Sequence, residues 1–181
     1  MIIKYGCVTL RAIEKRDFEL LFYLINAPEI EHRTVGWSYP VGKSAEERWI
    51  ENFENSNHSI KLMIELPDAK TIGMVMLEEI DWKNRTASFG CKINPLSKNR
   101  RKGDVQDAVK GIITYAFNEL GMNCIHGTLQ TDNLFSRKLC RRLGFVEEGI
   151  LRKRVYKNGK YKDLISVSLL KEEFEIKECL E

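Results

Sequence analysis

The segment between residues 94 and 121 combines the groups that a phosphate ligand needs. Basic residues precede Gly103, and apolar residues then recur at helical spacing up to Leu120. The first turn of a helix offers unpaired N–H groups and the positive end of the helix dipole, and a glycine lets a ligand approach the backbone closely. The alternative is a solvated loop before a core helix. The predicted phosphate ligands are Arg100, Arg101, Lys102, Gly103, Asp104, Val105 and Gln106.

Other phosphate and metal motifs are absent. No Gly-Lys-Ser/Thr follows Gly103, which excludes a P-loop, and the further glycines of a dinucleotide-binding fingerprint are missing. The five cysteines have no CxxC spacing and the three histidines are isolated, so we expect neither a metal site nor a disulfide framework. The net charge of +3 requires no nucleic acid, and no signal peptide or long apolar run is present, so we expect a cytoplasmic protein without membrane association.

Residues 1–181, with 43% hydrophobic content, are predicted to form a single domain with a substantial core. Ser44 and Glu47 are spaced as a capping box, and Asn158-Gly159 predicts a hairpin turn. The stretch 29–43 is predicted to be irregular, and the charged tail after Leu170 to be a frayed helix. Helices are predicted at 16–26, 44–53, 105–120 and 133–143, and strands at 7–13, 59–66, 71–80, 85–93, 124–129, 145–156 and 161–170.

The helix at 105–120 connects two predicted strands, 85–93 and 124–129. A strand, helix and strand in this order imply a parallel pair with a right-handed crossover. The strands before and after this unit follow one another through short turns, as antiparallel strands do. The predicted fold class is therefore α/β (α+β), with a mixed, mostly antiparallel sheet of about seven strands and about four flanking helices.

Two motifs resemble the GNAT superfamily of acetyl-CoA N-acetyltransferases. Arg100-x-x-Gly103-x-Val105 is similar to the family's pyrophosphate loop, Arg/Gln-x-x-Gly-x-Gly/Ala, although Val105 departs from it. Asn133-x-x-Ser136 opens a helix that ends in a Leu-Gly-Phe sequence typical of the family. Two further stretches resemble the RimJ/RimL type, which includes acetyltransferases of protein N-termini. The residues that carry this similarity are Ile72, Gly73, Ala87, Gly90, Ile93 and Pro95 in the first stretch, and Glu148, Gly149, Leu151, Arg152, Asn158, Gly159 and Asp163 in the second.

The resemblance implies that the parallel pair is splayed into a V-shaped opening that holds acetyl-CoA. Pantetheine would pair with the backbone of Cys91, Lys92 and Ile93, and Asn133 would hydrogen-bond the same arm of the cofactor. An N-cap role also suits Asn133, and one amide can serve both. Ser136 would lie beside the cofactor's sulfur.

The resemblance also implies direct attack of an amine on the thioester in a ternary complex. A strand N–H within residues 91–93 would stabilise the oxyanion, and an acid would protonate the departing thiolate. Ser136 is the first candidate for this acid, and Cys140, which stands where many relatives carry Tyr, is the second. The general base is not specified by the sequence; Glu79 is a candidate, with Glu78 and His126 as alternatives.

The acceptor is expected to lie against the predicted helix at 44–53 and the loop at 29–43, where His32, Trp37 and Tyr39 offer polar and aromatic contacts. An α-amine has a pKa near 8 and is about one-tenth neutral at pH 7, so it depends least on a strong base. This favours an acceptor such as a protein N-terminus. A polyamine, another small amine or an amino sugar is the alternative substrate, and an acyl-CoA-binding module without catalysis is the alternative function. The oligomeric state is left open, a homodimer included.

Overall fold

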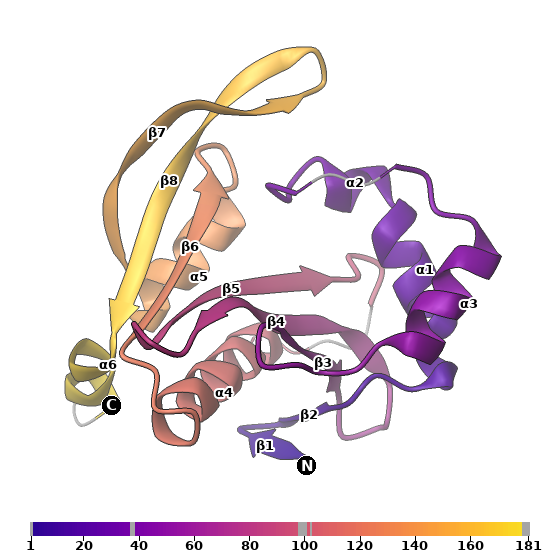
Figure 1. Ribbon diagram of the computed structural model, residues 1–181, viewed down its shortest axis with the longest axis horizontal. Helices are drawn as coiled ribbons and strands as arrows, with labels where there is room; N and C mark the ends of the chain where they lie inside the picture. The colour runs from indigo at the N-terminus through magenta and orange to yellow at the C-terminus, as the bar shows by residue number, and fades with distance from the viewer. Residues whose placement is uncertain (1, 37–38, 98–100, 102, 179–181) are drawn as a thin grey trace.

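The computed structural model describes residues 2–36, 39–97, 101 and 103–178. These residues form one eight-stranded sheet with the order β1-β2-β3-β4-β5-β6-β8-β7 (Figure 1). The strands are β1 Ile3–Tyr5, β2 Val8–Arg11, β3 Ile60–Glu65, β4 Thr71–Asp81, β5 Thr86–Ile93, β6 Cys124–Gln130, β7 Val146–Lys157 and β8 Lys160–Leu170. The helices are α1 Phe18–Asn26, α2 Pro28–Glu31, α3 Lys43–Asn52, α4 Asp104–Asn118, α5 Leu134–Leu143 and α6 Lys171–Glu178, with a 3-10 turn at Lys15–Asp17.

Neighbouring strands are antiparallel except for β5 and β6, which α4 connects as a parallel pair. The predicted mixed sheet with a central parallel pair is therefore confirmed. The strand β1 was not predicted, because three residues are too few to show an alternating pattern. The expected turn between β7 and β8 is present, and both Asn158 (φ 51°) and Gly159 (φ 73°) adopt the left-handed conformation that a two-residue hairpin requires.

Helices cover both faces of the sheet. Alternate residues of β3 and β4 point to opposite sides: Ile64 and Val75 join the core under α4, whereas Met63 and Met74 pack under α1 and α3. The apolar stripe predicted for α4 is buried, as Phe117 illustrates. The face under α1 and α3 is the one on which the candidate site is built.

Three local predictions need correction. Helix α3 begins at Lys43 with Gly42 as its N-cap, and no side chain caps it, so the predicted capping box at Ser44 is wrong. Pro28 does not merely follow a helix; it starts the short helix α2 within the stretch predicted to be irregular. The tail does form a helix, α6, as predicted, but its start is anchored and not frayed, because Phe174 is buried and its ring centroid lies 5.4 Å from that of Phe117.

Gly73 permits the close contact between β4 and β5. A Cβ at this position would lie 2.2 Å from the carbonyl oxygen of Lys92 and 2.9 Å from Cα of Ile93. The pairing of β3 with β4 shifts by one residue beside it, between Ile64 and Glu65. The bulge or close approach predicted at this glycine is therefore confirmed. Within the described part of the chain, no helix is both long and apolar enough to span a membrane.

Candidate active site

The parallel strands β5 and β6 pair only at their first residues. The register runs from Thr86 opposite Cys124 to Ser88 opposite His126, after which the strands diverge (Figure 1). The ring of Phe89 lies where they separate; its centroid is 4.7 Å from that of Phe145. The edge of β5 from Phe89 to Ile93 thus has no described strand beside it on the β6 side, and its backbone can pair with an extended ligand.

A cavity of about 700 Å³ occupies this opening and continues under α1 and α3. Its walls include the three residues predicted to pair with pantetheine, Cys91, Lys92 and Ile93, which lie on β5. The facing wall comes from β6 and α5, and includes Thr128 and Ser136. A volume of this size can hold a large ligand arm together with a small second molecule.

The N-terminus of α4 presents an open backbone surface. A Cβ added at Gly103 would meet no atom within 4 Å. Val105, which departs from the family pattern, is buried and therefore does not obstruct this surface. Asp104 is also buried: one carboxylate oxygen accepts from the Arg101 backbone N–H at 2.6 Å and so fixes the entry to the helix. Gln106 is half-buried in the same turn.

The side chain of Arg101 is exposed beside this turn, as a phosphate ligand needs to be. Arg100 and Lys102 lie outside the described residues.

Helix α5 places three predicted residues along the cavity: Asn133, Ser136 and Cys140. Asn133 is the N-cap; its Oδ1 accepts from the Ser136 N–H at 3.2 Å and its Nδ2 donates to the Arg33 carbonyl at 3.1 Å. Since an amide carries two N–H groups and two lone-pair sites, one of each remains for a ligand. Burial raises the pKa of the Cys140 thiol to about 12, so it stays protonated at neutral pH.

The structure brings a different carboxylate to the cavity than the one we predicted. Glu79 is exposed and does not line it, whereas Glu78 does and pairs with Lys61 at 3.1 Å. His126 is also absent from the lining. Glu46 of α3 lines the cavity with only 6% of its surface exposed, and burial raises the pKa of its carboxyl group.

The sequence carried a signal for Glu46. It precedes Trp49 and Ile50 by three and four residues, which puts all three on one side of α3. Glu46 therefore sits on the buried stripe of the helix, where a carboxylate is uncommon.

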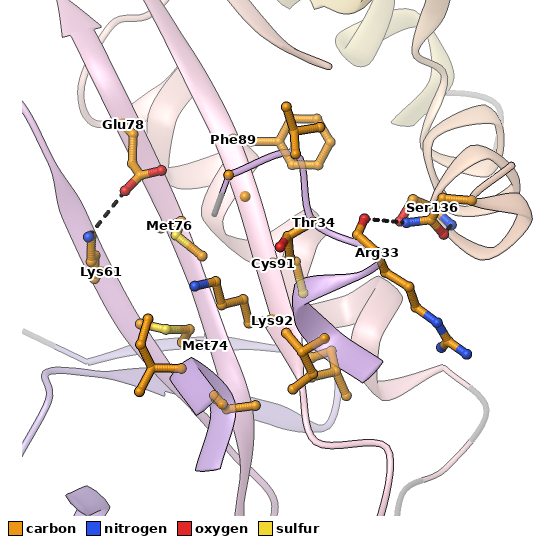
Figure 2. A pocket seen from close by; sticks show the side chains of 18 of the residues that line it. Arg33, Thr34, Lys61, Met74, Met76, Glu78, Phe89, Cys91, Lys92 and Ser136 are labelled. Atoms are coloured by element: carbon orange, nitrogen blue, oxygen red, sulfur yellow. Dashed lines mark hydrogen bonds and ion pairs between the residues drawn. The ribbon is translucent and has the colours of Figure 1, made fainter. Parts of the chain in front are cut away.

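Lys92 directs its side chain into the same part of the cavity. Figure 2 shows its ammonium lying over β4 between Met74 and Met76, beside the Lys61–Glu78 ion pair. Burial lowers the pKa of Lys92, and so does the nearby positive charge of Lys61. Only the backbone of this residue was predicted to belong to the site, because the pairing of β4 with β5 decides which residues its side chain contacts.

The loop after α2 does border the cavity, but through other residues than predicted. His32 and Tyr39 are exposed and do not line it, and Trp37 lies outside the described residues. The loop residues that do line the cavity are Arg33, Thr34, Val35, Gly36 and Val41.

Two buried polar side chains from the far end of the sheet hold this loop. Gln130 Nε2 donates to the carbonyls of His32 at 2.9 Å and Thr34 at 2.8 Å. Lys157 is paired with Glu31 and donates to the Gly36 carbonyl at 2.6 Å. The loop is therefore attached to the β6–β8–β7 side of the opening, although it follows α1 in sequence.

The sequence and the fold are similar to those of known proteins. A family model described as an acetyltransferase (GNAT) domain matches residues 8–146. The chain belongs to the GNAT acetyltransferases. It is an N-acetyltransferase, and acetyl-CoA is its cofactor. The residues of the opening fit this cofactor, since they combine a free strand edge, the open N-terminus of α4 and the polar start of α5.

Individual GNAT relatives differ in their acceptors. The chain is 39% identical to the putative ribosomal N-acetyltransferase YdaF of Bacillus subtilis over 110 residues, which are 61% of this chain and 59% of YdaF. It is 27% identical to the spermidine N(1)-acetyltransferase of Vibrio cholerae, over 92% of this chain and 95% of that protein. A crystal structure of the Vibrio cholerae spermidine N-acetyltransferase in complex with CoA and spermine superposes with a TM-score of 0.83 at 26% identity, covering 93% of this chain and 98% of that one.

Proposed function

We propose that this protein transfers the acetyl group of acetyl-CoA to a primary α-amine by direct attack in a ternary complex. The observation that carries the proposal is the early separation of β5 from β6 above a cavity with two ends. One end lies between β5 and the facing residues of β6 and α5, and the other lies under α1 and α3. A thioester held at the junction would face the amine without an acyl-enzyme intermediate.

The cofactor would be held by backbone more than by side chains. The free edge of β5 would pair with the amides of pantetheine, and an N–H within residues 91–93 would stabilise the oxyanion. Asn133 has one donor and one acceptor left for the same arm. The pyrophosphate would bind the amides of Gly103, Val105 and Gln106, where the open position of Gly103 leaves room for it.

Ser136 is the better candidate for protonating the departing thiolate. It lines the cavity, and its hydroxyl makes no hydrogen bond with any other described residue, so it is free to donate directly or through water. Cys140 packs into the apolar core, and a thiol is a weak hydrogen-bond donor.

Glu46 is the candidate base for the attacking amine. A buried carboxylate with a raised pKa is a stronger base than an exposed one, because proton uptake relieves the cost of its burial. Glu78 is the second carboxylate of the cavity, but it is partly exposed and already paired with Lys61 at 3.1 Å.

Similarity to the putative ribosomal enzyme YdaF suggests the α-amine of a protein N-terminus as acceptor. The structural likeness to a spermidine N-acetyltransferase supports a polyamine as the second candidate. A polycation is favoured by an acidic site. The charged residues lining the cavity are three acids, Glu29, Glu46 and Glu78, and three bases, Arg33, Lys61 and Lys92, which gives no such excess.

The proposal is tested by measuring CoA release from acetyl-CoA against N-terminal peptides, amino acids, polyamines, amino sugars and aminoglycosides. We expect turnover that depends on the amine and obeys sequential kinetics, with both substrates bound before CoA leaves. Parallel double-reciprocal lines with a trapped acyl-enzyme would contradict direct attack. Absence of turnover with every amine, despite acetyl-CoA binding, would support a cofactor-binding module instead.

A further inference from the structure

Two side chains of opposite charge line the part of the cavity under α1 and α3, where the acceptor would bind, and they do not contact each other. We call this part the acceptor end of the cavity. Glu46 comes from α3 and Lys92 from β5, and each influences the pKa of the other. No ion pair within 4.0 Å joins them in the described structure. Neither side chain forms a hydrogen bond or ion pair with any other described residue.

This arrangement is energetically unusual. An ionised group that is taken out of water is normally paired or hydrogen-bonded, because burial alone disfavours its charged form. Glu46 is 6% exposed and Lys92 is half-buried, and the surface beneath them is formed by Met74 and Met76. Both charges are therefore available to a molecule that enters the cavity.

We propose that Glu46 and Lys92 form a two-charge subsite for a zwitterionic acceptor, a free α-amino acid, whose ammonium group binds Glu46 and whose carboxylate binds Lys92. The inference rests on the proposed function and narrows its α-amine acceptor to one that carries its own carboxylate. Such a ligand would supply each buried charge with the partner that the protein does not provide.

The other acceptors would leave part of this subsite unpaired. A polyamine would satisfy Glu46 but bring a second positive charge towards Lys92 and Lys61. A peptide N-terminus carries a neutral amide next to its amine, which would leave the Lys92 ammonium without an anion. A site can discriminate strongly against a ligand that leaves one of its charges unpaired. The free-energy cost of desolvating that charge then adds to the loss of its attraction to the ligand.

Glu46 and Ser136 would move the protons of the transfer. Glu46 takes a proton from the bound ammonium, and the neutral amine attacks the thioester carbonyl. The nitrogen of the tetrahedral intermediate then releases its second proton to solvent. The carbon–sulfur bond breaks, and the CoA thiolate leaves with a proton supplied by Ser136, which recovers one from solvent. Lys92 is a positioning residue, since it holds the carboxylate and touches none of the reacting atoms.

Matched acceptors test the proposal directly. Each of several L-amino acids is compared with its decarboxylated amine, its α-amide and spermidine, by kcat/KM from CoA release. We expect the amino acids to exceed their decarboxylated amines and amides by at least tenfold. Equal use of both members of a pair, or preference for a peptide N-terminus, would overturn the inference while leaving the proposed function standing. Preference for spermidine would overturn the inference and the α-amine acceptor as well, and would favour the polyamine alternative. No turnover of any amine would instead remove the proposed function itself.

Variants assign the selectivity to the subsite. Lys92→Met matches the neighbouring methionines in character and removes the charge; it should lower kcat/KM for amino acids about 10- to 100-fold, as a lost charge-assisted hydrogen bond does. The kcat/KM for the decarboxylated amines should fall much less. The ratio of kcat/KM for an amino acid to kcat/KM for its decarboxylated amine should therefore fall at least tenfold. Lys43→Met and Glu47→Gln, exposed changes on α3, are the matched controls and should preserve the ratio.

Binding can be measured without turnover. Calorimetry of an amino acid against the protein saturated with CoA should give binding in wild type and at least tenfold weaker binding in Lys92→Met and in Glu46→Gln. If Lys92→Met lowers thermal stability but leaves the amino acid-to-amine ratio unchanged, the two charges serve only to stabilise each other and the proposal is wrong.

Discussion

Replacement of Gly103 by valine is the sharpest test of the cofactor site, because the structure separates its effect on binding from its effect on folding. The backbone of Gly103, with φ −97° and ψ −18°, is accessible to any L-residue, and a Cβ there meets no atom within 4 Å. The position is the N-cap of α4. The loss of folding stability should therefore be at most about 1 kcal/mol.

The effect on acetyl-CoA should be much larger. A branched side chain would stand between the pyrophosphate and the amides that follow it in α4. A hydrogen bond to a charged group contributes about 1.5–3 kcal/mol, so the loss of one or two such bonds weakens binding by roughly 100-fold. At an acetyl-CoA concentration 100 times the wild-type Kd, the ligand stabilises the wild type by about 2.7 kcal/mol but the variant by only about 0.4 kcal/mol.

Calorimetry gives the Kd and thermal unfolding gives the stabilisation. For a chain of this length, the two free energies correspond to rises in Tm of roughly 5–10 °C and 1–2 °C. Gly149→Val is the matched control, since this glycine of β7 also has open space around its Cβ and lies away from the cavity. Wild-type affinity in Gly103→Val would show that the pyrophosphate does not bind at the start of α4.

Three further outcomes follow from the site. Ser136→Ala should lower kcat by about 10- to 100-fold with little change in the Kd for acetyl-CoA, and Cys140→Ala should lower kcat less; single-turnover kinetics measure both, and the reverse order would move the acid to Cys140. Glu46→Gln should raise the Tm of the free protein at neutral pH. Burial raises the folded-state pKa of Glu46, so wild-type stability falls as the pH rises above the ordinary value of 4.5. The difference in Tm between variant and wild type should therefore vanish below that pH. A constant difference across pH would contradict this reasoning. Lys157→Met should release the loop that includes Gly36. We then expect the KM of the acceptor to rise more than that of acetyl-CoA, and hydrogen exchange in residues 31–36 to become faster. Unchanged exchange would mean that Gln130 alone holds the loop.

Several elements are determined by the sequence alone because their causes are local. The apolar stripe of α4 repeats with the period of a helix, and Gly144, with φ 97°, ends α5 as a C-cap glycine. Asn133 caps the start of that helix, because its side-chain oxygen accepts a hydrogen bond from the backbone N–H three residues later. Asn158-Gly159 defines the hairpin of β7 and β8 by its backbone preferences. Each of these needs only neighbouring residues, so the order of the strands and helices other than β1 and α2 could be predicted from the sequence.

The acceptor end of the cavity was decided by the tertiary structure. Lys92 meets Met74 because β4 and β5 pair in one register, and Glu46 faces them because α3 packs over that side of the sheet. The loop after α2 was predicted to reach the site through His32, but Gln130 binds that residue's carbonyl and leaves its side chain exposed. Contacts between segments distant in sequence depend on register and packing, and no local pattern encodes them.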